Sequence, residues 1–268
     1  MKKSIIIFGT TLAILSLLIL GFTNWNNNET NVPTNNKDLV LENQDIIGPN
    51  LKAIPDLYYG VDSRFAAVKK SEIAKATSIY DFLNAGEKEQ IVDIKSVNLT
   101  VIKDNQLSEL HELGTTDQLT KEQIKLLRSL DFFNHFTIRT EFKGNNMITG
   151  VIEDKFFGPH ITIVPEIQAN YVEGKEALIT YLKESSLDVM YAIKDDKINA
   201  VKFSFIITKE GKVTNVKHDA MTTGYPTIDD KFIELLKNIP GKWTPAENAN
   251  GKKMEQELVF TFGPRDGC

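Results

Sequence analysis

The residues of this chain whose types suggest chemistry do not fall at the spacings that catalysis or metal binding requires. His111-Glu112 begins like a zinc-protease helix, in which a second histidine follows one helical turn later, but position 115 is a threonine. Two metal ligands therefore cannot share a helix face there. The other three histidines are far apart in the sequence; they are His135, His160 and His218. We predict no bound metal and no cofactor.

Motifs for a nucleophile or a phosphate site are also missing from the sequence. Gly211-Lys212 and Gly251-Lys252 lack the earlier glycine of a P-loop, and hairpin turns explain them better. No Gly-x-Ser-x-Gly elbow occurs, and the single cysteine, Cys268, is the last residue of the sequence. Asp195-Asp196 falls on an expected loop, and Asp229-Asp230 falls at an expected helix start, where aspartate favours the helix dipole. We therefore predict no catalytic residue and a protein that is not an enzyme.

The composition is that of a globular protein and excludes several functional classes. Hydrophobic residues make up 41% of the 268 residues and charged residues 25%, so the chain as a whole is not disordered. The net charge of −5 offers no general attraction to nucleic acid or to anionic lipid. One cysteine cannot build an intrachain disulfide framework. The length predicts one large domain or two of roughly 100 to 150 residues.

The first residues differ from this average. Two lysines precede residues 5–22, a stretch without any charge that is long enough, as a helix of roughly 27 Å, to cross a bilayer. Trp25 follows where an interfacial aromatic residue is expected, and the lysines favour a cytoplasmic N-terminus. We therefore expect residues 1–23 to form a transmembrane anchor. The alternative is a signal peptide, cleaved after the weak small-residue pair Gly21 and Thr23, which would leave a secreted protein.

The rest of the chain is expected to contain a linker and two domains. Residues 24–38 are rich in asparagine and poor in hydrophobic residues, which predicts a flexible linker. Residues 39–164 are expected to form a middle α+β domain, and residues 165–268 a second domain. The fold class that we predict is therefore α+β, with an N-terminal transmembrane helix.

The middle domain is expected from hydrophobic alternation and one marked helix start. Residues 91–103 predict a strand, and alternating apolar residues at 136–142 and an apolar run at 161–164 predict two more. Thr120 and Gln123 have the spacing of a capping box, which predicts a helix between the first two strands.

The last hundred residues predict the order helix, strand, strand, helix, strand. A glycine turn joins the two central strands, because glycine takes the positive φ that a tight hairpin needs. The expected elements are a helix from Gly174, strands at 201–207 and 213–217 with the turn at Gly211, a helix capped by Thr227 and ended by Pro240, and a strand at 258–262.

This order resembles the C-terminal domain of the TonB family of bacterial cell-envelope proteins. The matching pieces run in the family's order and end with the terminal strand: Gly174–Leu178, Val201–Phe205, Lys209–Val216, Lys242–Ala246, Gly251-Lys252 and Glu257–Phe262. The resemblance implies a small antiparallel sheet packed with helices, on a protein held in the inner membrane with its domains in the periplasm. The middle region is similar to envelope proteins of the Bacteroidetes group, a similarity that implies no activity.

The chain departs from the energy-transducing members of that family. Its predicted membrane segment contains no histidine, it has no long spacer rich in proline and lysine, and Leu187–Ala192 stands where the family has a Tyr-Pro pair. A membrane-anchored protein that binds envelope partners, in TonB-linked transport, therefore fits better than a transducer. The alternatives are a genuine proton-motive-force transducer for outer-membrane receptors and a self-associating structural protein.

The resemblance also implies where a partner binds. In the family, a short receptor segment pairs with the last strand, whose unpaired backbone groups a partner strand can satisfy. The implied partner-binding edge here consists of Glu257, Leu258, Val259, Phe260, Thr261 and Phe262, with Glu257, Val259 and Thr261 pointing outward. The alternative is that the middle domain or a second copy of the chain, in a homodimer, covers this edge. Trp243 is expected in the core rather than at a partner surface.

Overall fold

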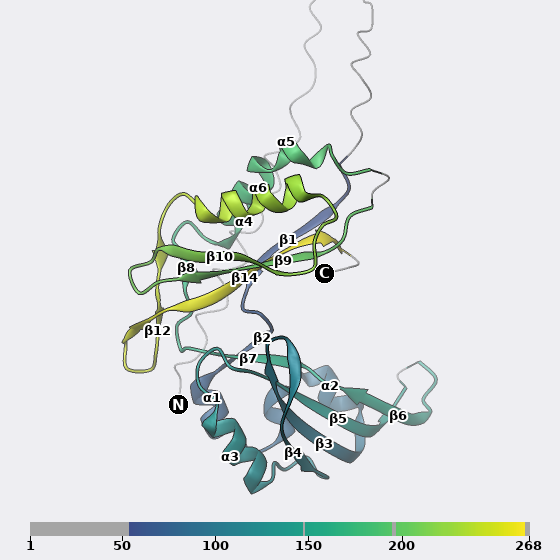
Figure 1. The fold of residues 1–268 in the computed structure, drawn as a ribbon. Coiled ribbons are helices and arrows are strands. Elements are labelled where there is room, and N and C mark those ends of the chain that lie inside the picture. The colour runs from purple at the N-terminus through teal and green to yellow at the C-terminus, as the bar shows by residue number, and fades with distance from the viewer. Residues whose placement is uncertain (1–53, 147, 195–196, 266–268) are drawn as a thin grey trace, which may run out of the picture. The chain divides into compact units, whose positions relative to one another are not determined.

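The computed structural model describes residues 54–146, 148–194 and 197–265 (Figure 1). The predicted anchor at 1–23 and the predicted linker at 24–38 lie outside these residues, as do Asp195-Asp196 and Cys268. No helix within the described residues is long and apolar enough to cross a membrane. The fold class that we predicted is therefore wrong: the described part of the chain is a mixed, sheet-rich fold in which strand residues outnumber helix residues.

The first of two large sheets has six strands, in the order β2-β7-β5-β3-β4 with β6 paired to β5. All pairs are antiparallel except β2 with β7. The capping box predicted at Thr120 is confirmed, because Gln123 N donates to Thr120 Oγ1 at 3.1 Å and Thr120 N donates to Gln123 Oε1 at 3.0 Å. The strands are β2 (Ala66–Lys69), β3 (Ile91–Lys103), β4 (Gln106–Gly114), β5 (His135–Asn145), β6 (Ile152–Phe157) and β7 (His160–Val164).

Helices cover one face of this sheet, and the hydrophobic core lies between the helices and the sheet. Alternate residues of β3 and β5, such as Leu99 and Ile138, pack against Ile73 and Leu127 of the helices. The amphipathic spacing of these helices therefore accounts for their position. The helices are α1 (Lys70–Lys75), the short 3₁₀ helix η1 (Ile79–Phe82), α2 (Ala85–Gln90) and α3 (Lys121–Ser129).

The second large sheet has four antiparallel strands in the order β1-β14-β9-β10. Phe203, Phe205, Phe260 and Phe262 point from this sheet into a core that Phe232 and other helix residues complete. Figure 1 shows the helices on one side of the sheet. The elements are β1 (Leu57–Asp62), α4 (Lys175–Ser185), α5 (Leu187–Met190), β9 (Val201–Ile207), β10 (Val213–Ala220), α6 (Pro226–Lys237) and β14 (Gln256–Pro264), with the short pairs β8 (Asn170–Tyr171) with β11 (Trp243–Thr244) and β12 (Ala246–Glu247) with β13 (Lys253–Met254).

Two local predictions for this region are confirmed and one is wrong. Gly211 has φ +74° in the turn between β9 and β10, as the hairpin requires. Trp243 belongs to the core. Thr227, however, does not cap α6, because the helix begins with Pro226 at its first position. Asp229 is buried there and accepts a hydrogen bond from Thr223 Oγ1 at 2.7 Å, so it does more than favour the helix dipole.

Strand β1 is the main departure from the expected topology. It belongs by sequence to the predicted middle domain, yet it pairs with β14 over six residues, from Leu57 opposite Pro264 to Asp62 opposite Val259. Strand β14 therefore lies between β1 and β9, and the described edges of this sheet are β1 and β10. The predicted free edge at 257–262 is closed from Val259 onward, which corresponds to the alternative in which the middle region covers it.

Candidate functional site

The predicted partner-binding residues lie on both faces of an interior strand. Leu258, Phe260 and Phe262 point into the core beneath the helices. Val259 is buried on the opposite face, and the Glu257 carboxylate is bonded to Arg64 at 2.7 Å. These side chains are therefore already in use within the chain, apart from the partly exposed Thr261.

Strand β1 does not cover the whole length of β14, and the first residues of β14 extend past its end. Strand β1 ends at Asp62, opposite Val259, while β14 begins three residues earlier at Gln256. Residues 256–258 pair with β9 on one side, and no described strand pairs with them on the other side. A cleft opens at this point, and Leu258 forms part of its wall.

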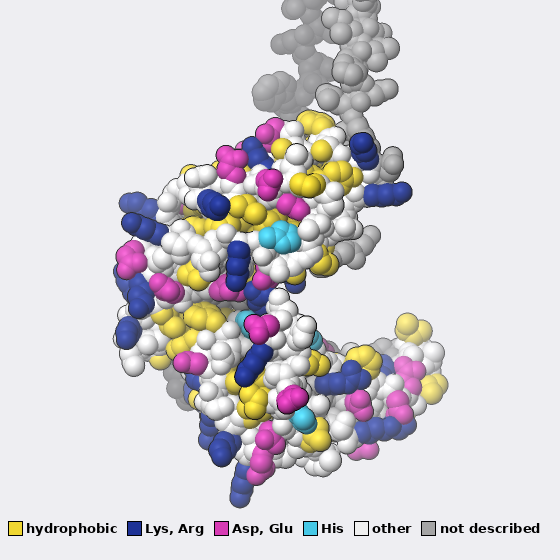
Figure 2. Space-filling model, in the orientation of Figure 1, with side chains coloured by type: hydrophobic (Ala, Val, Ile, Leu, Met, Phe, Trp, Pro, Cys, Tyr) yellow, Lys and Arg dark blue, Asp and Glu magenta, His cyan; other side chains and the backbone are white. Residues whose placement is uncertain are grey.

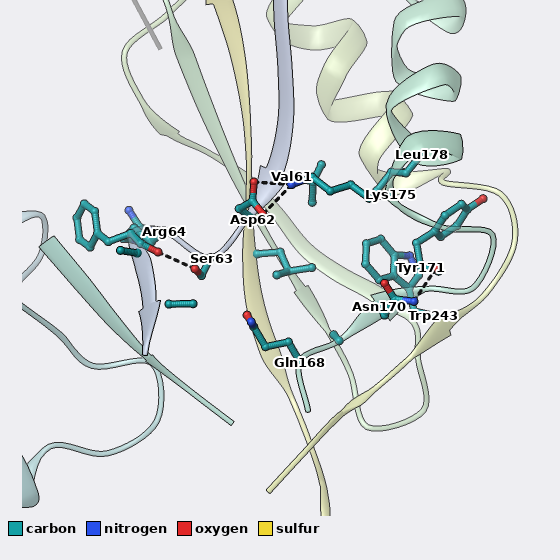
Figure 3. Close-up of a pocket in the computed structure, with 15 residues that line it drawn as sticks. Val61, Asp62, Ser63, Arg64, Gln168, Asn170, Tyr171, Lys175, Leu178 and Trp243 are labelled. Atoms are coloured by element: carbon teal, nitrogen blue, oxygen red, sulfur yellow. Dashed lines mark hydrogen bonds and ion pairs between the residues drawn. The ribbon is translucent and has the colours of Figure 1, made fainter. Parts of the chain in front are cut away.

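This cleft has a volume of about 540 Å³ and combines apolar walls with a polar rim (Figure 3). Its size is in the range of roughly 300 to 1,000 Å³ that is typical of ligand sites. It is lined by residues of β1, β2, β8, α4, β11 and β14 and of the segments after β1 and before β8. The apolar lining includes Val61, Phe65, Ala169, Tyr171, Leu178, Trp243 and Leu258, and the polar lining includes Asp62, Ser63, Arg64, Gln168, Asn170 and Lys175.

Buried Gln256 holds one wall of the cleft. Its Oε1 accepts a hydrogen bond from Ala169 N at 2.7 Å, and its Nε2 donates to Gln168 Oε1 at 3.1 Å. These bonds tie the first residue of β14 to the segment before β8. A buried amide with both ends hydrogen-bonded fixes its neighbours more firmly than an apolar contact does. No sequence pattern marks Gln256, so its role is not predictable from the sequence.

The ring of Trp243 closes the apolar end of the cleft. Its centroid lies 5.4 Å from that of Tyr171 and 6.0 Å from that of Phe205. The Tyr171 hydroxyl donates to Pro240 O at 2.7 Å, which fixes its ring. Burial, followed by the nearby charge of Glu173, raises the pKa of Tyr171. Trp243 is thus both a core residue, as predicted, and a wall of the cleft.

The rim carries one exposed ion pair and an ordered turn. Lys175 Nζ lies 2.7 Å from Asp62 Oδ2, and both side chains are exposed. Such a pair contributes little to stability, so either partner can exchange it for another contact. The Ser63 hydroxyl donates to Phe65 O at 2.6 Å, which orders the chain where it leaves β1. Figure 3 shows both interactions beside the cleft.

Arg64 is the most heavily bonded side chain at this site. It binds Asp219 with two nitrogens, at 2.6 and 3.0 Å, and Glu257 at 2.7 Å. It also donates to Asn105 Oδ1, in the turn between β3 and β4, at 2.8 Å. The side chains of Arg64 and Asp219 are only 10% and 8% exposed. Burial lowers the pKa of Arg64, but the hydrogen bonds that its guanidinium group donates to both carboxylates outweigh this effect, so the pKa is raised overall.

His135 and His160 are distant in the sequence but both pack against Phe65, the residue that follows Arg64. The rings of His135 and His160 lie 5.3 and 5.1 Å from that of Phe65, each edge to face. His135 Nδ1 is also 3.0 Å from Thr162 Oγ1. Burial, and then the charge of Arg64, lower the pKa of His135, although Glu257 and Asp219 oppose the shift.

His135 should therefore make the folded state less stable in acid. Below its ordinary pKa of about 6.5, the unfolded chain protonates this histidine while the folded chain resists, so the free energy of unfolding falls as the pH falls. Urea denaturation of the full chain between about pH 5 and 7 measures this slope. In His135→Gln the slope should be shallower than in the parent. An unchanged slope would contradict the assignment, and His218→Gln, at an exposed histidine on β10, serves as the matched control.

The other chemistry-bearing residues of the sequence are not brought together. His111 and Glu112 lie on strand β4 rather than on a helix, and His111 Nδ1 is near only the Glu109 carbonyl, at 3.0 Å. Among the described residues, no group of three or more His, Cys, Asp or Glu side chains is arranged to hold a metal ion. The zinc-protease interpretation therefore has no structural support.

Comparison of the chain with protein-family models, with curated proteins and with solved structures found no match. The resemblance to TonB-type domains is therefore left without a test. The cleft and its rim are instead interpreted from their own geometry.

Proposed function

We propose that this protein is a non-catalytic binding protein that holds an extended segment of a partner protein in the cleft beside β14. One observation supports this proposal above the others. Strand β1 stops opposite Val259, so the backbone groups of Glu257, which face away from β9, have no described strand partner, and Leu258 beside it lines the cleft. An extended segment can add its backbone there as a short strand, which is a common mode of peptide recognition.

The walls of the cleft suit such a segment. Partly exposed Phe65 and Ala169 offer an apolar surface for one side chain of the partner. The buried Leu178, Trp243 and Leu258 contribute only the small part of their surface that lines the cleft. Backbone pairing with Glu257, whose N–H and C=O face away from β9, would supply affinity, while this pocket would supply selectivity. The proposed mode of binding is the strand addition predicted from the sequence, but its place moves from the whole of residues 257–262 to the start of β14.

The rim adds a charge preference. Among the described residues, Lys175 forms an ion pair with the exposed Asp62 alone, so its ammonium group is available to a partner carboxylate at little cost. Arg64 is unavailable in this way, because Asp219 and Glu257 already occupy its guanidinium group. We therefore expect the preferred segments to combine one large apolar residue with a nearby acidic residue.

The expected partners are other proteins of the cell envelope. This part of the proposal rests on the uncharged stretch at 5–22, which lies outside the described residues. The location in the inner membrane and periplasm stays a prediction. No observation on the cleft favours the energy-transducing alternative.

The test is a selection of peptides from a random display library on the full chain. Ala169→Phe should fill the cleft without adding a charge and weaken binding of the selected peptides by about tenfold or more. Lys175→Glu should weaken the binding of those selected peptides that carry an acidic residue. Leu187→Phe, on the exposed side of α5, is the matched control and should bind as the parent does. The proposal fails if no peptide is enriched, or if the peptides bind Ala169→Phe as tightly as the parent.

A further inference from the structure

The hairpin between β5 and β6 ends in exposed aliphatic side chains. Ile148 is 95% exposed, and Val151 and Ile152 are each more than half exposed. From Gly144 to Ile152 the sequence contains no charged residue. In Figure 2 hydrophobic side chains gather at the end of this hairpin, which Figure 1 locates by the label β6. Such a cluster of aliphatic residues at the end of a hairpin needs an explanation.

The backbone at this end of the hairpin is hydrogen-bonded within itself. Asn146 Oδ1 accepts from Ile148 N at 3.0 Å and from Thr149 N at 3.2 Å. Asn146 O accepts from Gly150 N at 2.7 Å, and Asn146 N donates to Val151 O at 2.9 Å. Val151 N in turn donates to Thr149 Oγ1 at 3.4 Å. These N–H groups therefore do not depend on water, which meets part of the requirement for entering an apolar phase.

Charged residues begin only behind this end. Lys95 and Lys143 both bond Asp154 Oδ1 at 2.7 Å, and Lys155 donates to Asn145 O at 3.0 Å. Lysine side chains on long stems can hold their charge at the level of lipid headgroups while the stems lie along apolar surface. The hairpin is therefore apolar at its end and polar behind it.

We propose that the exposed end of this hairpin, residues 148–152, inserts into the interfacial region of a lipid bilayer. Aliphatic residues dominate the exposed end, whereas the centres of protein interfaces are enriched in aromatic residues and arginine. The end of one hairpin is also narrow compared with the roughly 800 Å² that a stable protein interface covers on each side. Because the net charge is −5, the contact rests on apolar burial rather than on attraction to anionic lipid. The inference is independent of the cleft.

The experiment uses the full chain with Cys268→Ser and a single new cysteine, Thr149→Cys, labelled with nitrobenzoxadiazole. The probe vesicles contain phosphatidylcholine and phosphatidylethanolamine, with and without a nitroxide on the acyl chains. Vesicles should raise the emission by about twofold and shift it to the blue, and the nitroxide should quench it. The same label at Tyr191→Cys, on an exposed residue at the end of α5, is the control and should not respond.

Adding Val151→Asp to the Thr149→Cys chain should raise the lipid concentration that gives half of the emission change by roughly tenfold, because a carboxylate is disfavoured among acyl chains. No response at position 149 would overturn the inference. So would an equal response at 149 and 191, which indicates attachment through another part of the chain. A response at 149 to a purified envelope protein but not to vesicles would assign the hairpin to a protein partner instead and would also overturn it.

Discussion

Replacing Arg64 with methionine should lower the free energy of unfolding by about 3 kcal/mol. The change keeps most of the side chain's volume but removes the charge, and it leaves the Asp219 carboxylate buried without its partner. Removal of one member of a buried ion pair destabilises the fold by more than the intact pair stabilises it, because the remaining charge stays out of water. Glu257, which is more exposed, should contribute less.

Urea denaturation at neutral pH measures the change, with Arg265→Met as the matched control. Arg265 also bonds a carboxylate, Asp56 at 2.6 Å, but both side chains are mostly exposed. The control should therefore stay within about 1 kcal/mol of the parent. The double variant Arg64→Met, Asp219→Asn should recover part of the loss, because it removes the buried charge. Equal losses in Arg64→Met and Arg265→Met would contradict the arrangement around Arg64.

Tyr59→Ala should lower the free energy of unfolding by about 3 kcal/mol. The Tyr59 ring lies on the core face of β1, 5.0 Å from the ring of Phe262 and 6.1 Å from that of Phe232. It is the main aromatic contact of β1 with the core, so its loss should also loosen β1 on β14. Hydrogen exchange at Val259 and Thr261, whose N–H groups face β1, should then become faster, because β14 loses its neighbour on that side.

Tyr58→Ala removes the same residue type from the opposite face of the strand and is the matched control. Tyr58 does not belong to this core, so we expect a loss of about 1 kcal/mol or less. Exchange at β14 should remain slow in this variant. If both variants exchange as slowly as the parent, β1 does not protect β14 and the interior position of β14 is wrong.

Local patterns in the sequence predicted local structure well. The capping box at Thr120, the glycine turn at Gly211 and the alternation of β9 were predictable because each depends on residues within a few positions of one another. The position of Trp243 in the core was also predicted correctly. The exception was the start of α6, where Pro226 at the first helical position replaced the expected cap.

Long-range pairing was not predictable in the same way. Strand β1 pairs with residues about 200 positions later, and nothing in Leu57–Asp62 specifies that partner. Arg64 and Gln256 were missed for the same reason, since a single arginine or glutamine has no signal until the fold places carboxylates or amides around it. Residues 257–262 do form a strand, as predicted. Whether that strand lies at an edge depends on β1, which we predicted to belong to the middle domain.

The most direct test of the proposed binding site is photocrosslinking of a selected peptide to the full chain. Benzoylphenylalanine replaces Gln168, which lines the cleft, or Thr261, which lies where β1 pairs with β14. A partner held in the cleft should form an adduct from position 168 and none from position 261. An adduct from position 261 without one from position 168 would show that the partner displaces β1 along β14, and would contradict the cleft as the binding site.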